Sequence, residues 1–291
     1  MNGVPGGGLG YGTADGRGAR RARGGLARSS MPPVLMYHSV TPYRDDPYLV
    51  TVSPQRFGQQ LSWLRDRGLR GVSMSTLLAA RRAGDGRGLV GLTFDDGYAD
   101  FISCAMPELA RYGFGATVFP IAGRLGGRND WDERGPRKAL MTAQQVKEAA
   151  AAGIEIGSHG LTHTAMPGMA DDELAGEAGR SRELLQDASS QDVTGFCYPY
   201  GHLDARVAAA VEEAGYDYAC AIWRSPRTGP HAIPRVYIGD GDVGWRLRAK
   251  ALRHWLTWDY RGPGAARLAR LAAPAGTSPD AGGPVGVHHF A

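Results

Sequence analysis

The chain has 291 residues, a formal net charge of +4 and 43% apolar residues, which suits one soluble α/β domain with flexible ends. The basic excess is small and many of the arginines lie near the two ends, which argues against nucleic-acid readout. The three cysteines form no CxxC pair, so the sequence predicts neither a disulfide framework nor a cysteine zinc site.

The two ends of the chain differ in composition from the middle. Residues 1–30 are rich in Gly and Arg and hold almost nothing that could be buried, so we expect them to be disordered. Met31 is a candidate translation start, residues 31–262 are the expected folded domain, and residues 263–291 are an expected flexible tail. The sequence as written shows no secretory signal and no membrane span, which predicts a cytoplasmic protein; a misassigned start would allow an extracellular or cell-surface one.

Short apolar runs alternate with helical patterns, which indicates repeated β-α units closing into a parallel sheet or barrel. The expected strands are Val34–Tyr37, Leu89–Phe94, Ala116–Ile121, Ile154–Ser158, Thr194–Tyr198 and Tyr218–Ile222. The expected helices are Arg56–Arg67, Ala99–Tyr112, Ala143–Ala152, Asp172–Asp187 and Ala205–Ala214. Ser53 followed by Pro54 is typical of a helix start, and Thr142 with Gln145 of a capping box.

A last amphipathic helix is expected at Trp245–Tyr260, where basic and aromatic residues alternate. The sequence favours packing of its aromatic side chains on the domain, with the basic side chains in water. Peripheral contact with a membrane surface, or with a glycan, is the less favoured alternative.

The residues most suited to chemistry follow the ends of expected strands. They are His38, Asp95, Asp96, His159 and Tyr200. In β/α barrels the loops after the strands build the catalytic rim, so we expect these side chains to lie close together.

Asp95 and Asp96 are adjacent at a strand end and are followed by Gly97, which permits a tight turn. Neighbouring side chains on an extended backbone point apart. One carboxylate is therefore free to bind a metal while the other faces a substrate, and the charge of the cation helps to keep that second carboxylate ionised as a base.

His159 and His163 are four residues apart and lie on one face if this stretch is helical, within reach of one ion. A HxxxH pair alone is weak evidence, but here it follows an expected strand in the same chain as the double Asp. One Asp and two His leave coordination positions open for water and substrate.

Three segments together resemble a known family. Thr93–Gly97, His159–His163 and Phe196–Gly201 resemble the three main motifs of the polysaccharide deacetylases, carbohydrate esterase family 4 with a NodB-like domain. The segment from Leu35 to Val40 further resembles the branch of biofilm poly-N-acetylglucosamine deacetylases. The resemblance implies a single-domain, distorted (β/α) barrel and a metal-dependent hydrolase that removes acetyl groups from N-acetylated amino sugars.

By that resemblance Asp96, His159 and His163 bind the metal, Asp95 is the general base, and the backbone N–H of Tyr200 contributes to the oxyanion site. The hydrolytic assignment favours Zn²⁺, although the same ligands accept Co²⁺, Ni²⁺ or Fe²⁺. The expected partner is an N-acetylated carbohydrate, with no nucleic acid. Four aromatic side chains could stack on sugar faces or could equally serve packing: Trp131, Tyr198, Tyr200 and Trp223.

The sequence departs from the family pattern at three places. Position 197 is Cys where the family usually carries an Arg that orients the base, and Arg235 is our candidate replacement. Gly160 stands where Ser or Thr is common, which removes one hydroxyl near the metal. The family's C-terminal motif, which carries the histidine that acts as general acid, is not evident, since Leu252–His254 matches it only loosely.

The sequence therefore does not identify the residue that protonates the leaving amine. His38 could protonate a leaving amine or could make a structural hydrogen bond beneath the site, and the sequence does not separate the two roles. His254 is the second choice, and we expect the others to be solvated: His202, His231, His288 and His289.

Three other functions remain open from the sequence. An O-acetyl esterase would use the same oxyanion site. A glycan-binding protein with weak catalysis is suggested by the Cys at position 197, although it would have no need of Asp95. A non-haem Fe(II) oxygenase also uses two His and one carboxylate, but commonly on a jelly roll and not on β/α strand ends.

Overall fold

The computed structural model describes residues 31–225 and 227–259, the last five of them by their backbone alone. The predictions for residues 1–30 and 263–291 lie outside the described residues. Within the described part, no helix combines the length and the apolar character that a bilayer span requires.

The strands are short and all their pairings are parallel. They are β1 Val34–Tyr37, β2 Ser39–Val40, β3 Thr51–Val52, β4 Arg70–Val72, β5 Leu89–Phe94, β6 Thr117–Val118, β7 Glu155–Ile156, β8 Gly195–Cys197, β9 Tyr218–Ala221, β10 Ile233–Pro234 and β11 Val236–Tyr237.

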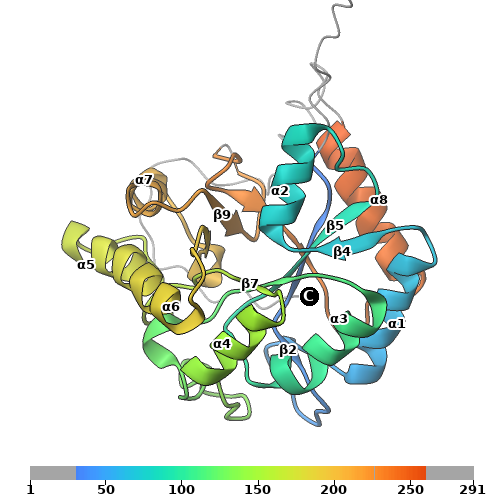
Figure 1. The fold of residues 1–291 in the computed structure, drawn as a ribbon, viewed down its shortest axis with the longest axis horizontal. Helices are drawn as coiled ribbons and strands as arrows, with labels where there is room; N and C mark the ends of the chain where they lie inside the picture. Colours follow the sequence, from blue (N-terminus) through green and yellow to red (C-terminus); the bar gives the residue numbers. More distant parts are fainter. Residues whose placement is uncertain (1–30, 226, 260–291) are drawn as a thin grey trace, which may run out of the picture.

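The helices lie outside the strands (Figure 1). They are α1 Pro54–Arg65, α2 Met74–Ala83, α3 Met106–Tyr112, α4 Ala143–Ala151, α5 Asp171–Ala175, α6 Ser181–Ser189, α7 Ala205–Glu213 and α8 Trp245–Asp259. Two π-helical turns, η1 Phe101–Ala105 and η3 Gly176–Arg180, precede α3 and α6, and two 3₁₀ turns follow strands, η2 Ala122–Arg124 and η4 Pro199–Gly201.

Two sheets together form the distorted α/β barrel that the sequence predicts. The first runs β11-β1-β5-β6-β7, with β4 also on β5, and the second runs β10-β9-β8. A bridge between Ser158 and Phe196 joins β7 to β8 on one side. On the other side the chain crosses from β10 to β11 at Arg235, which places this residue in the seam between the sheets.

The centre of the barrel is built on β5, whose residues after Leu89 are all buried. A strand covered on both faces needs such a continuous apolar run, since parallel sheets carry helices outside. Tyr37 stacks on Phe94 at 5.2 Å, and Phe57 and Phe101 pack edge-on against Phe94. This cluster supports the end of β5, where the two aspartates follow.

The structure confirms the bounds of some predicted secondary-structure elements and shortens others. The bounds predicted for β1 and β5 are confirmed, and so is the capping box of α4, in which Thr142 and Gln145 satisfy each other's backbone. The predicted strand Ala116–Ile121 contains only the two residues of β6. At α1 the Pro54 start is confirmed, but the hydroxyl of Ser53 donates to Asp240 and does not cap the helix.

Candidate active site

Asp95 and Asp96 follow β5 in a sharp turn. Asp96 has a φ of 67° and Gly97 a φ of 69°, both in the left-handed region. A side chain at Gly97 would place its Cβ 2.7 Å from Cα of Pro120, so only glycine fits this turn. The turn sends the two carboxylates apart, as predicted: Asp95 contacts Arg235, and Asp96 contacts the two histidines.

His159 and His163 follow β7 in a loop, so the condition of a helix at this stretch is not met. Nδ1 of His159 lies 2.8 Å from the carbonyl oxygen of Cys197, which directs its Nε2 toward Oδ1 of Asp96 at 3.3 Å. His163 has a φ of 66° and brings its own Nε2 within 3.3 Å of the same oxygen. The two rings converge because the loop turns back at His163, and not because they share a helix face.

These three side chains suit a divalent cation. Their ligand atoms lie within 4.8 Å of one another, and all three residues are buried. One carboxylate and two imidazoles are a donor set that zinc enzymes use, with a position left for water or substrate. The Nδ1 atom of His163 is buried without a hydrogen-bond partner.

The three side chains of this cluster differ in their pKa shifts. Burial opposes protonation of His159, but its contacts with Cys197 and Asp96 outweigh burial and raise its pKa well above the ordinary value, so a metal would have to displace a proton there. Burial disfavours ionisation of Asp96, but hydrogen bonds from His159 and His163 outweigh it and hold the pKa of Asp96 well below its ordinary value. Burial lowers the pKa of His163, which favours the neutral imidazole that a metal requires.

Asp95 is held by a buried guanidinium. Nη1 and Nη2 of Arg235 donate to its two oxygens at 2.6 and 2.7 Å, and the two side chains are 0% and 4% exposed. Burial opposes ionisation of Asp95, but the charge and hydrogen bonds of Arg235 outweigh it and lower the pKa of Asp95. Arg235 thus makes the contact that the sequence analysis expected of a replacement arginine.

Cys197 lies beside this ion pair. Its Sγ is 3.1 Å from Nη2 of Arg235 and 3.5 Å from Oδ2 of Asp95, and burial raises the pKa of the thiol, which stays neutral. A carboxylate has about four lone-pair sites, of which Arg235 and the thiol occupy three. One acceptor site of Asp95 therefore remains for a water molecule.

His38 approaches Asp95 from the end of β1. Its Nε2 lies 4.0 Å from Oδ2 of Asp95, and its Nδ1 is buried without a hydrogen-bond partner. The neighbouring backbone is fixed, because Asp100 accepts from the hydroxyl of Ser39 and the N–H of Val40 at 2.6 and 2.9 Å. Lys138 donates to the same Ser39 hydroxyl at 3.0 Å. Sequence patterns do not indicate the roles of Lys138 and Asp100, because each acts on a segment distant in the chain.

Aromatic rings flank the second histidine. The ring centroids of Trp131 and Tyr200 lie 4.4 and 4.7 Å from that of His163. Tyr200 has a φ of 58° and is 45% exposed. Tyr198 is buried and its hydroxyl donates to the carbonyl of His231, so of its two expected roles packing is confirmed.

The other histidines lie elsewhere. His254 is buried on α8, and its Nε2 lies 2.9 Å from the carbonyl oxygen of Met31. His202 is exposed, as expected, but Nε2 of His231 lies 2.8 Å from the carbonyl of Tyr216, so that side chain is not simply solvated. The predictions for His288 and His289 fall outside the described residues.

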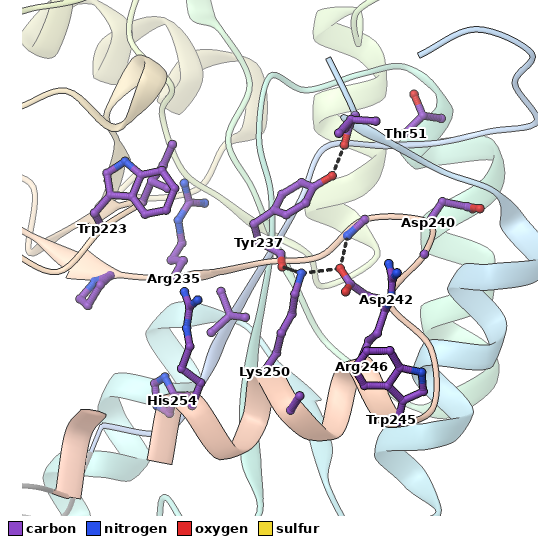
Figure 2. Close-up of a pocket in the computed structure, with 18 of the residues that line it drawn as sticks. Thr51, Trp223, Arg235, Tyr237, Asp240, Asp242, Trp245, Arg246, Lys250 and His254 are labelled. Atoms are coloured by element: carbon purple, nitrogen blue, oxygen red, sulfur yellow. Dashed lines mark hydrogen bonds and ion pairs between the residues drawn. The ribbon is translucent and has the colours of Figure 1, made fainter. Parts of the chain in front are cut away.

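A separate groove of about 990 Å³ runs between α8 and the segment that carries Arg235 and Tyr237 (Figure 2). Lys250 crosses it to bond Asp242 and the carbonyl of Tyr237. Trp245 at its rim is 74% exposed, so the expectation that the aromatic residues of this helix pack on the domain is wrong for Trp245. Tyr260 lies outside the described residues.

Comparison with known proteins points to one family. The polysaccharide deacetylase family model matches residues 82–219. YxkH of Bacillus subtilis, which is assigned by name to the same family, is 29% identical over 217 residues, 73% of each chain. A poly-β-1,6-N-acetyl-D-glucosamine N-deacetylase of Escherichia coli is 30% identical over 133 residues, which are 43% of this chain and 20% of that enzyme. The Streptococcus pyogenes deacetylase PplD shares the fold, with a TM-score of 0.65 and 23% identity over 76% of this chain and 97% of PplD.

Proposed function

Because the chain belongs to the polysaccharide deacetylase family, we propose that it is a metal-dependent hydrolase that removes acetyl groups from N-acetylated amino sugars in a glycan or glycoconjugate. The observation that carries the proposal is the buried cluster of Asp96, His159 and His163 beside an Asp95 held by Arg235. The activity of the E. coli relative supports N-acetylglucosamine as the sugar.

Asp96, His159 and His163 would hold the cation, with Zn²⁺ as the first choice and Co²⁺, Ni²⁺ or Fe²⁺ as alternatives. When bound, a divalent cation polarises the acetyl carbonyl and makes a water molecule more acidic. The chain contributes the orientation of the ligands. His159 is fixed through its Nδ1 by the carbonyl of Cys197, and a ligand held in this way keeps its ring plane and its tautomer.

Asp95 is the proposed general base. Its free acceptor site takes the proton of the attacking water while Arg235 keeps the carboxylate ionised and in one orientation. The low pKa of Asp95 makes it a weak base toward bulk water, so its role depends on a water that is already acidified. That dependence ties the base to the metal site next to it.

The remaining steps use Tyr200 and His38. As the carbonyl carbon becomes tetrahedral, the backbone N–H of Tyr200 would donate to the oxygen that gains negative charge, a contribution of about 3–4 kcal/mol for one such donor. His38 would then pass a proton to the leaving nitrogen, because an imidazole exchanges protons readily near neutral pH. Nε2 of His38 lies 4.0 Å from Oδ2 of Asp95, so this proton donor stands beside the base without a hydrogen bond to it.

The test is acetate release from N-acetylglucosamine oligomers by the full chain, after metal removal and after Zn²⁺ or Co²⁺ is restored. We expect release that requires metal and that Asp95→Asn lowers by about 10²–10⁴-fold. Metal binding that requires His159 and His163, without acetate release from N- or O-acetylated sugars, would contradict the proposal and favour glycan binding without catalysis.

A further inference from the structure

The loop between the two proposed metal ligands is anchored by a distant carboxylate. Oε2 of Glu177 accepts hydrogen bonds from the N–H groups of Leu161 and Thr162 at 2.7 and 3.2 Å. Oε1 accepts from the hydroxyl of Thr162 at 2.5 Å. One side chain from η3 therefore accepts three hydrogen bonds from the two residues that precede His163.

The opposite edge of the loop is held by backbone. The N–H groups of Ala122 and Gly123 donate to the carbonyls of Gly160 and Leu161 at 3.0 and 2.9 Å. Among the described residues, the N–H groups of Leu161 and Thr162 have no backbone acceptor. Their acceptor is the carboxylate of Glu177. Leu161 is half-buried and Thr162 is exposed, so loss of the carboxylate would leave their N–H groups to water and remove the protein contact that orders the loop.

Glu177 is itself tightly placed. It is buried, and the next turn is tied to the strand end below the histidines, because Ser158 donates to Ser181, whose hydroxyl donates to the carbonyl of Ala178. At Gly160, which has a φ of 78°, an added Cβ would lie 2.9 Å from Oε2 of Glu177. The absent side chain at position 160 thus makes room for the carboxylate.

We propose that Glu177 is a positioning residue for the metal centre, which fixes the loop so that His163 keeps its left-handed backbone and its Nε2 faces Asp96. This inference rests on the proposed function, since it concerns the same metal. It explains how the site does without a hydroxyl at position 160: the acceptor that orders the loop comes from η3.

The test is a titration of the metal-free full chain with Co²⁺ and Zn²⁺, for the wild type, Glu177→Ala and Glu177→Gln. We expect about 10- to 100-fold weaker binding for Glu177→Ala, the usual range for residues that orient metal ligands. Glu177→Gln should lie between, because the amide oxygen can still accept from the N–H groups of Leu161 and Thr162, while the charge is lost and the amide NH2 replaces the acceptor of the Thr162 hydroxyl. Glu173→Ala is the matched control, since the exposed Glu173 accepts only from the N–H of Ala170.

Hydrogen exchange of the metal-free protein gives a readout that is independent of metal. The amides of Leu161 and Thr162 should exchange faster in Glu177→Ala than in the wild type, while those of β5 should not change. Faster exchange across the whole domain, or a metal affinity that Glu173→Ala lowers equally, would overturn the role in favour of general loosening.

A His159→Ala variant separates this inference from the proposed function. Metal binding that needs His159 but is unchanged in Glu177→Ala overturns the role of Glu177 alone. Binding that does not need His159 overturns the metal site itself, and the role of Glu177 with it.

Discussion

Replacement of Arg235 by Met tests the buried ion pair on which the proposed base depends. Met keeps most of the volume and removes the charge, so Asp95 is left buried without its partner. Breaking a buried pair by removing one member costs about 3–5 kcal/mol, because the remaining charge has neither solvent nor counter-ion. We expect a loss of that size in the free energy of unfolding, measured by urea denaturation of the metal-free full chain at neutral pH.

The matched control is Arg180→Met. Arg180 pairs with Glu183 at 2.9 Å, but the two side chains are 57% and 65% exposed, so this change should cost no more than about 1 kcal/mol. The double variant Arg235→Met/Asp95→Asn removes both charges and should recover much of the lost stability. If Arg235→Met costs no more than Arg180→Met, Asp95 is not a buried charge that depends on Arg235.

The pH dependence gives a second readout of the same change. In the wild type the pKa of Asp95 is lowered, so the pair stabilises the fold above the ordinary carboxyl value of 3.8 and loses that contribution as pH falls through the folded pKa. In Arg235→Met the largest contribution that opposes burial is lost, so the pKa of Asp95 should lie above its value in the wild type. The acid limb of kcat/KM should therefore move to higher pH, and an unmoved limb would refute control of Asp95 by Arg235.

Three further changes probe the other parts of the site. His38→Gln should lower kcat by about 10²–10⁴-fold on N-acetyl substrates but much less on an activated aryl acetate, whose leaving group needs no proton; equal losses would argue for a structural role. Tyr200→Gly should keep kcat within several-fold, because the proposed donor is backbone and glycine tolerates the φ of 58°; a loss above about 10²-fold would assign the role to the side chain. Gly97→Ala should abolish Co²⁺ binding detected by absorption, since its Cβ would meet Pro120 at 2.7 Å and displace Asp96, and unchanged binding would contradict the turn geometry.

The parts of the site that the sequence predicts are those that follow local patterns. β5 reads as a continuous apolar run ending in two aspartates, and the structure keeps both its bounds and the divergence of the carboxylates. The capping box at Thr142 is likewise predictable, because it involves only four consecutive residues. In these places neighbours in sequence are also neighbours in space.

Contacts between distant segments were harder to predict. Arg235 was identified because a family motif lacked its arginine, and it reaches Asp95 across the seam between the two sheets. Sequence patterns do not identify Glu177, since nothing near it in sequence suggests a contact with Leu161, 16 residues earlier. β4 is also absent from the predictions, because a strand of three residues leaves too short an apolar pattern to recognise.

The two histidines were expected on one face only if His159–His163 is helical, and the reason why it is not helical bears on function. A spacing of four suits a helix, but here the rings converge because His163 adopts a left-handed conformation, which residue type does not announce. Asp96 and Tyr200 adopt the same conformation. Each such residue costs of order 1–3 kcal/mol and persists only where surrounding contacts impose it. Two proposed metal ligands, Asp96 and His163, and the proposed oxyanion donor, Tyr200, all adopt this unfavourable conformation. The contacts of the domain therefore stabilise three strained backbone positions around one site.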